Sequence, residues 1–102
     1  MAKRINIFPL AQQDLDSIFN YINNDLNNPT AAIKLINQFE YSFNMLALFP
    51  ESGPLVDNKM VKNYANYRKL IVNNYIAFYT YNDDEVLIVR VISGMRDYYD
   101  LL

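Results

Sequence analysis

Three arginines in the C-terminal third of the chain, Arg68, Arg90 and Arg96, are the residues best suited to chemistry, and tyrosines lie between the first two. A guanidinium can hold a phosphodiester through two parallel hydrogen bonds, and a phenol ring can stack on a base. Arginine and tyrosine are also enriched at the energetic centres of protein interfaces. The pattern therefore indicates either an RNA-binding surface or a protein-binding surface.

Each of these arginines also has a simpler structural interpretation. The stem of Arg90 could cover apolar surface while its guanidinium reaches water or an acid. Arg68 could form a salt bridge at the edge of a sheet, a contact worth about 0–1 kcal/mol. Both alternatives remain open at the level of sequence.

Missing residue types exclude several kinds of active site. The chain has no histidine and no cysteine, so catalytic triads that need either residue, disulfides and thiolate metal sites are impossible. Its two glycines, Gly53 and Gly94, are too far apart for a phosphate-binding loop. The acidic pair Asp14 and Asp16 is expected on the solvent side of a helix. We expect neither a metal nor another cofactor.

Composition sets the class of protein. The 102 residues are enough for one domain, covering residues 1–102, and nine Lys and Arg against eleven Asp and Glu give a net charge of −2. Proteins that bind DNA through its phosphates usually carry a basic excess, so no direct DNA binding is expected. No apolar run approaches the roughly 18 residues needed to cross a membrane, and the N-terminus leads into no secretory segment. We expect a cytoplasmic protein that does not contact membranes.

Two helices are expected in the first half of the chain. A short strand at residues 5–8 leads into Pro9, which suits the first turn of a helix. Apolar residues then recur at helical spacing up to Leu26, and again from Ala32 to Leu46 after Asn28 and Pro29. The connection is so short that the two helices must form an antiparallel hairpin.

Three strands are expected after a loop at residues 50–66: residues 67–72, 75–81 and 85–92. A two-residue turn at Asn73-Asn74 would pair Arg68 with Tyr79, and a turn near residues 83–84 would pair Tyr79 with Ile88 and Ala77 with Arg90. We therefore predict an α+β fold: an N-terminal strand and a long helical hairpin packed on one face of a mainly antiparallel sheet of about four strands.

This register sorts the side chains between the two faces of the sheet. One face, expected beneath the helices, carries only apolar residues: Ile71, Ile76, Phe78, Leu87, Val89 and Val91. The other face, expected to be open to solvent, is aromatic and cationic: Arg68, Leu70, Tyr75, Tyr79, Tyr81, Ile88 and Arg90. Exposed apolar and aromatic patches mark interaction sites, so we expect function on this second face.

Several short segments, which together span nearly the whole chain, follow one another in a characteristic order. They are Pro9-Leu10-Ala11 with Asp14-Leu15 and Ile18, Tyr21-Ile22, Pro29 with Ala31-Ala32, Leu48-Phe49-Pro50 with Gly53, Tyr67 to Val72 with Tyr75, and Arg96-Asp97-Tyr98 with Leu101. In this order and spacing the chain resembles the RelE/ParE superfamily of toxins from type II toxin–antitoxin (plasmid stabilisation) systems.

This resemblance implies a toxin that inhibits growth and is neutralised by a cognate antitoxin protein, part of which wraps around the toxin and adds a strand to its sheet. The RelE branch cleaves mRNA on the ribosome without a metal, and the ParE branch acts on DNA gyrase. The positions that match the RelE-branch catalytic site are Arg68 and Arg96, with Tyr98 or Tyr99 near the tyrosine position. The surface for target or partner would comprise Arg68, Tyr75, Tyr79, Arg90, Arg96, Tyr98 and Tyr99.

Departures from the RelE pattern favour the ParE branch. Many relatives carry histidine where this chain has Ser93 and a basic residue where it has Met95. RNA cleavage without a metal needs a base, and no side chain here has an intrinsic pKa near neutrality. The long helical hairpin is also more similar to ParE. We therefore favour a toxin that acts on DNA gyrase, with a ribosome-dependent mRNA endoribonuclease and a non-toxic binding module of the same family as the alternatives.

Overall fold

A computed structural model describes residues 2–56 and 67–94 of the chain. The elements are β1 (Arg4–Ile7), α1 (Pro9–Asn20), the π-helical turn η1 (Tyr21–Asp25), α2 (Pro29–Leu48), β2 (Arg68–Val72), β3 (Tyr75–Tyr81) and β4 (Glu85–Ser93). The four strands form one sheet in the order β1-β4-β3-β2, with β1 parallel to β4 and the other pairs antiparallel. The α+β fold expected from the sequence is therefore confirmed.

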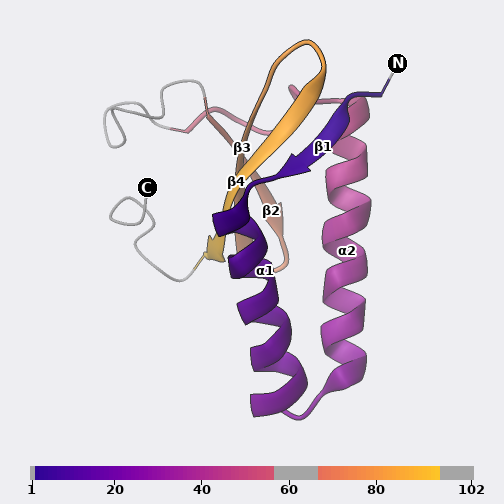
Figure 1. Cartoon of the computed structure of the whole chain (residues 1–102), viewed down its shortest axis with the longest axis vertical. Helices are drawn as coiled ribbons and strands as arrows, with labels where there is room; N and C mark the ends of the chain where they lie inside the picture. Colours follow the sequence, from indigo (N-terminus) through magenta and orange to yellow (C-terminus); the bar gives the residue numbers. More distant parts are fainter. Residues whose placement is uncertain (1, 57–66, 95–102) are drawn as a thin grey trace.

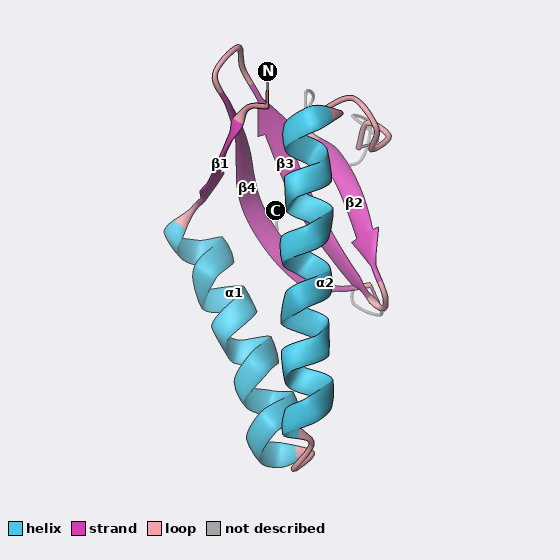
Figure 2. Cartoon of the chain, turned by 90° about the vertical axis from the view of Figure 1, so that its right-hand side faces the viewer, coloured by secondary structure: helices cyan, strands magenta, loops and turns pink. Residues whose placement is uncertain are grey.

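The helical hairpin forms where the apolar spacing predicts it. Pro9 and Pro29 both occupy the first turn of their helices, and the Asn28 side chain accepts a hydrogen bond from the Ala31 N–H at 3.1 Å. The first helix ends in a π-helical turn, in which the Leu26 N–H bonds to the Tyr21 carbonyl at 3.0 Å. Both helices lie on one side of the sheet and extend beyond its end toward the turn that joins them (Figures 1 and 2).

The hairpin between β2 and β3 has the predicted register. Asn73 adopts a positive φ of 54°, as a tight two-residue turn requires, and Arg68 lies opposite Tyr79. Between β3 and β4 the register holds only as far as Tyr79, which lies opposite Ile88. A β-bulge lies between Tyr79 and Phe78. On the far side of the bulge, Ala77 lies opposite Val91 and not opposite Arg90 as predicted.

The predicted assignment of the two sheet faces is wrong. The helices cover the face that carries Leu70, Tyr75, Ala77, Tyr79 and Ile88, which pack with residues of α1 and α2. Tyr79 is fully buried, and Ile71, which was expected beneath the helices, is 66% exposed.

Both faces of β3 are apolar, so its pattern does not indicate which face the helices cover. The opposite face is not bare either, because Val56 packs there against Ile76, Phe78 and Ile92, with Tyr67 beside them. Of the residues expected beneath the helices, Val91 lies there, since the bulge shifts the alternation of β4 by one residue.

Candidate functional site

Arg68 and Tyr79 together hold the segment that follows α2. The buried Tyr79 hydroxyl donates a hydrogen bond to the Pro50 carbonyl at 2.8 Å and accepts one from the Gly53 N–H at 3.0 Å. The Arg68 Nη1 donates to the carbonyl of Gly53 at 2.7 Å and to that of Glu51 at 3.2 Å. We call residues 50–53 the anchored segment.

This arrangement leaves the Tyr79 phenol a poor acid or base near neutral pH. Burial raises the pKa of Tyr79 above its ordinary value of 10.0, although its hydrogen bond to Gly53 and the nearby Arg68 charge act in the opposite direction. Because the hydroxyl is also occupied by main-chain partners, its role in this structure is to fix the anchored segment.

The same segment continues along the outer edge of β2. The Lys69 N–H donates to the Pro54 carbonyl at 3.1 Å, and the Val56 N–H donates to the Tyr67 carbonyl at 2.8 Å. There is little room at Gly53, where an added Cβ would lie 2.4 Å from the Lys69 carbonyl oxygen and 2.7 Å from the Tyr79 hydroxyl. The sequence had indicated only a surface loop here.

Arg90 forms the structural contact that its simpler interpretation allows. Its Nε and Nη2 donate to the two carboxylate oxygens of Asp14 on α1, at 2.8 and 3.1 Å. One of these oxygens also accepts the Val91 N–H at 2.9 Å. The two side chains are only 17% and 15% exposed, so Asp14 does not lie on the solvent side of its helix as expected. β1 pairs with β4 only as far as Ile88, and the ion pair joins α1 to β4 beyond that residue.

The remaining candidate residues are dispersed. Tyr75 is half-buried, and its ring centroid lies 5.9 Å from that of Phe39 on α2. Tyr81 is also half-buried, with Arg68 and Lys3 at 6.0 and 5.8 Å from its ring centroid. Arg96, Tyr98 and Tyr99 lie outside the described residues. The described part of the sheet therefore brings Arg68, Tyr79 and Tyr81 together, but not as an open surface.

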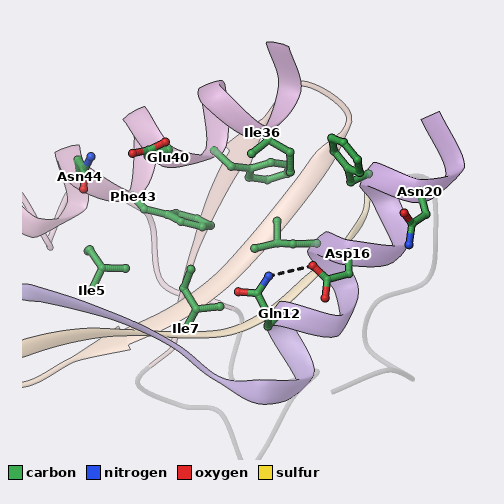
Figure 3. Close-up of a pocket in the computed structure, with 12 residues that line it drawn as sticks. Ile5, Ile7, Gln12, Asp16, Asn20, Ile36, Glu40, Phe43 and Asn44 are labelled. Carbon is green, nitrogen blue, oxygen red and sulfur yellow. Dashed lines mark hydrogen bonds between the residues drawn. The ribbon is translucent and has the colours of Figure 1, made fainter. Parts of the chain in front are cut away.

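A groove that the sequence analysis did not anticipate lies between β1 and the two helices. It has a volume of about 510 Å³, and we call it the helix groove (Figure 3). Its apolar lining comprises Ile5, Ile7, Leu15, Phe19, Ile36, Phe39 and Phe43. The spacing of Phe19 and Ile36 had assigned them to the apolar stripes of their helices. Only the three-dimensional arrangement shows that both are left partly exposed.

Polar side chains surround this apolar lining on both helices. Gln12, Asp16 and Asn20 come from α1, and Glu40 and Asn44 from α2 (Figure 3). Asp16 accepts a hydrogen bond from the Gln12 amide at 3.0 Å. Within residues 2–56 and 67–94, no cation lines the groove, and neither Asp16 nor Glu40 forms an ion pair.

A second groove, of about 650 Å³, lies on the other side of α2, between this helix and β2. Its exposed apolar residues include Ile33, Tyr41 and Ile71, and Lys34 is the charged residue of its lining. These two grooves, on opposite sides of α2, therefore carry opposite charge.

The described residues contain no cluster of three or more acidic side chains that could hold a metal ion. Within the same residues, no helix is both long enough and apolar enough to cross a membrane.

A comparison with models of protein families identifies one that matches most of the chain. Residues 5–98 match a family described as the ParE toxin of type II toxin-antitoxin system, parDE. Among curated protein sequences, no significant match was found.

Several solved structures share the fold. The chromosomal ParDE system from P. aeruginosa gives a TM-score of 0.71 at 19% identity, covering 90% of this chain and 96% of that one. The RelBE2 complex from Mycobacterium tuberculosis gives 0.64 at 18% identity, covering 91% and 99%. The E. coli DinJ-YafQ complex gives 0.55 at 15% identity, covering 92% and 94%.

Proposed function

Because the chain belongs to the ParE toxin family of type II toxin–antitoxin systems, we propose that it inhibits bacterial growth when unopposed and that a cognate antitoxin protein neutralises it. Solved structures with the same fold are named as toxin–antitoxin complexes, which supports an antitoxin as the partner. The proposed cellular target is DNA gyrase, contacted as a protein and without chemistry on RNA. Gyrase and ribosomes are both cytoplasmic, so the proposal puts the chain in the cytoplasm.

One observation carries the choice of target: Arg68 and Tyr79 are both engaged in holding the anchored segment. RNA cleavage without a metal needs a base for the 2′-hydroxyl and cations for the developing charge. Tyr79 is buried, bonded to two main-chain groups, and has a raised pKa. One terminal nitrogen of Arg68 donates hydrogen bonds to two main-chain carbonyls. These engagements favour a toxin that acts through protein contact.

The second candidate is a ribosome-dependent endoribonuclease, and the exposure of Arg68 favours it. Arg68 as a residue is only half-buried, its guanidinium lies beside the Tyr81 ring, and its Nε and Nη2 form no hydrogen bond with the described residues. In this alternative Arg68 would act with Arg96 and Tyr98. The third candidate is a non-toxic member of the family that is kept as a binding module.

Induced expression in a bacterium that lacks the antitoxin tests these three functions. Protein synthesis is followed by pulse labelling, mRNA integrity by primer extension, and DNA damage by a reporter of the damage response. We expect filamentous cells with damaged DNA while translation persists. Rapid arrest of translation with cut mRNA would establish the endoribonuclease instead, and harmless expression would establish the binding module.

Two matched variants make the test specific for Arg68. Arg68→Ala removes the guanidinium, and Lys69→Ala removes a positive charge from the next residue of the same strand. We expect both variants to remain toxic at a temperature at which circular dichroism shows that they are folded. If folded Arg68→Ala is harmless and Lys69→Ala is toxic, the guanidinium is needed for toxicity, and mRNA that the wild type cuts and Arg68→Ala leaves intact would establish the second candidate.

A further inference from the structure

The helix groove carries its charge on both walls. Asp16 lies on α1 and Glu40 on α2, so the two carboxylates flank the apolar lining from opposite sides (Figure 3). Both side chains are exposed, and neither is neutralised by a cation of the described residues. A ligand in this groove would therefore meet apolar surface along its middle and negative charge along each side.

We propose that the helix groove binds an amphipathic helix of the antitoxin whose apolar stripe is bordered on both sides by lysine or arginine. The choice of partner rests on the proposed function, since the antitoxin is the protein expected to bind this chain. The charge of the ligand is inferred from the groove itself. A helix fits because both walls are helices, and their side chains form ridges and grooves into which those of a third helix pack.

The second groove makes the inference specific. That groove is also apolar, but Lys34 is the charged residue of its lining, so a basic helix gains no attraction there. Apolar burial alone would not distinguish the two sides of α2. Asp16 and Glu40 are therefore the residues that we expect to select which helix binds and on which side of α2 it lies.

Synthetic peptides test this proposal without the antitoxin. Three fluorescent probes of about 18 residues, or five helical turns, are sufficient. The first carries leucine at helical spacing with lysine beside the stripe, the second carries the same leucines with glutamate, and the third has the composition of the first with strictly alternating leucine and lysine. Binding to the full chain is measured by fluorescence anisotropy at low and high salt.

We expect the wild-type chain to bind the basic helical peptide about tenfold more tightly than the acidic one, because each exposed ion pair is worth up to about fivefold in affinity. The preference should shrink at high salt, which screens exposed charges. Asp16→Asn with Glu40→Gln should reduce it to about threefold or less, and Asp16→Lys with Glu40→Lys should reverse it.

Two control variants separate the groove from the overall charge of the chain. Asp83→Asn with Asp84→Asn removes the same charge at the β3–β4 turn, and Lys34→Ala alters the second groove; we expect neither to change the preference. The proposal is overturned if the wild-type chain does not discriminate between the helical peptides. It is also overturned if the alternating peptide binds best, or if the Asp83 and Asp84 variant acts like the groove variant. Because no readout involves toxicity, a failure here would leave the proposed function standing, and a non-toxic chain could still show the preference.

Discussion

Replacing Tyr79 with phenylalanine tests whether this residue is an anchor for the chain. The ring is fully buried and would be kept, so the substitution removes only the hydroxyl and its hydrogen bonds to Pro50 and Gly53. Each hydrogen bond contributes about 0.5–1.5 kcal/mol net, and the buried Gly53 N–H would lose its partner. We therefore expect the free energy of unfolding to fall by about 2 kcal/mol, with the melting temperature lower by roughly 10 °C.

Tyr81→Phe is the matched control. This tyrosine is half-buried, and its hydroxyl forms no hydrogen bond with the described residues, so the change should cost less than about 0.5 kcal/mol. Urea unfolding followed by circular dichroism measures both variants. If Tyr79→Phe is as stable as Tyr81→Phe, the hydroxyl does not anchor residues 50–53 and the argument that it is unavailable for chemistry fails.

The remaining predictions concern the same contacts and the ion pair of α1. Because burial raises the pKa of Tyr79 in the folded chain, its contribution to stability should be constant below about pH 10, the unfolded value, and fall above it; a difference between wild type and Tyr79→Phe that does not change across this range would contradict the raised pKa. Asp14→Ala should lower the free energy of unfolding by about 2–3 kcal/mol, less than a fully buried pair costs, and Asp14→Asn should cost less because its amide oxygen can still accept the Val91 N–H; equal losses in urea unfolding would show that the charge alone matters. Gly53→Ala should lower the free energy of unfolding by about 1–3 kcal/mol, because the added Cβ meets the backbone of β2. A Gly53→Ala variant with wild-type stability would show that the anchored segment does not lie against β2 in this way.

The sequence was sufficient to predict the helical hairpin and most of the strand register. Helix positions follow from apolar spacing bounded by Pro9, Asn28 and Pro29, which are local signals. The register of β2 and β3 follows from Asn73, whose positive φ closes a two-residue turn. Such features depend on neighbouring residues and can be predicted without knowledge of the tertiary structure.

The sheet faces could not be predicted in this way. β3 presents Ile76 and Phe78 on one face and Ala77 and Tyr79 on the other, and all four are buried. Alternation shows which residues share a face, but not which face the helices cover. The bulge at the Phe78–Tyr79 step of the β3–β4 pairing breaks the alternation of β4, and no residue type in the sequence marks it.

The interactions of the candidate residues depend on contacts between distant segments. Tyr79 reaches Pro50 and Arg90 reaches Asp14, pairs that lie far apart in the sequence. A sequence pattern shows that an arginine is present, but not whether its guanidinium is already occupied by a carboxylate. For the same reason, the helix groove becomes apparent only when α1, α2 and β1 are placed together.

We propose that this chain inhibits growth by acting on DNA gyrase and does not cut RNA. The most direct test of this claim adds the purified chain either to gyrase with relaxed plasmid or to ribosomes translating a defined mRNA. We predict loss of supercoiling activity in the first reaction and intact mRNA in the second. Unaffected supercoiling together with mRNA cleaved on the ribosome would contradict the claim.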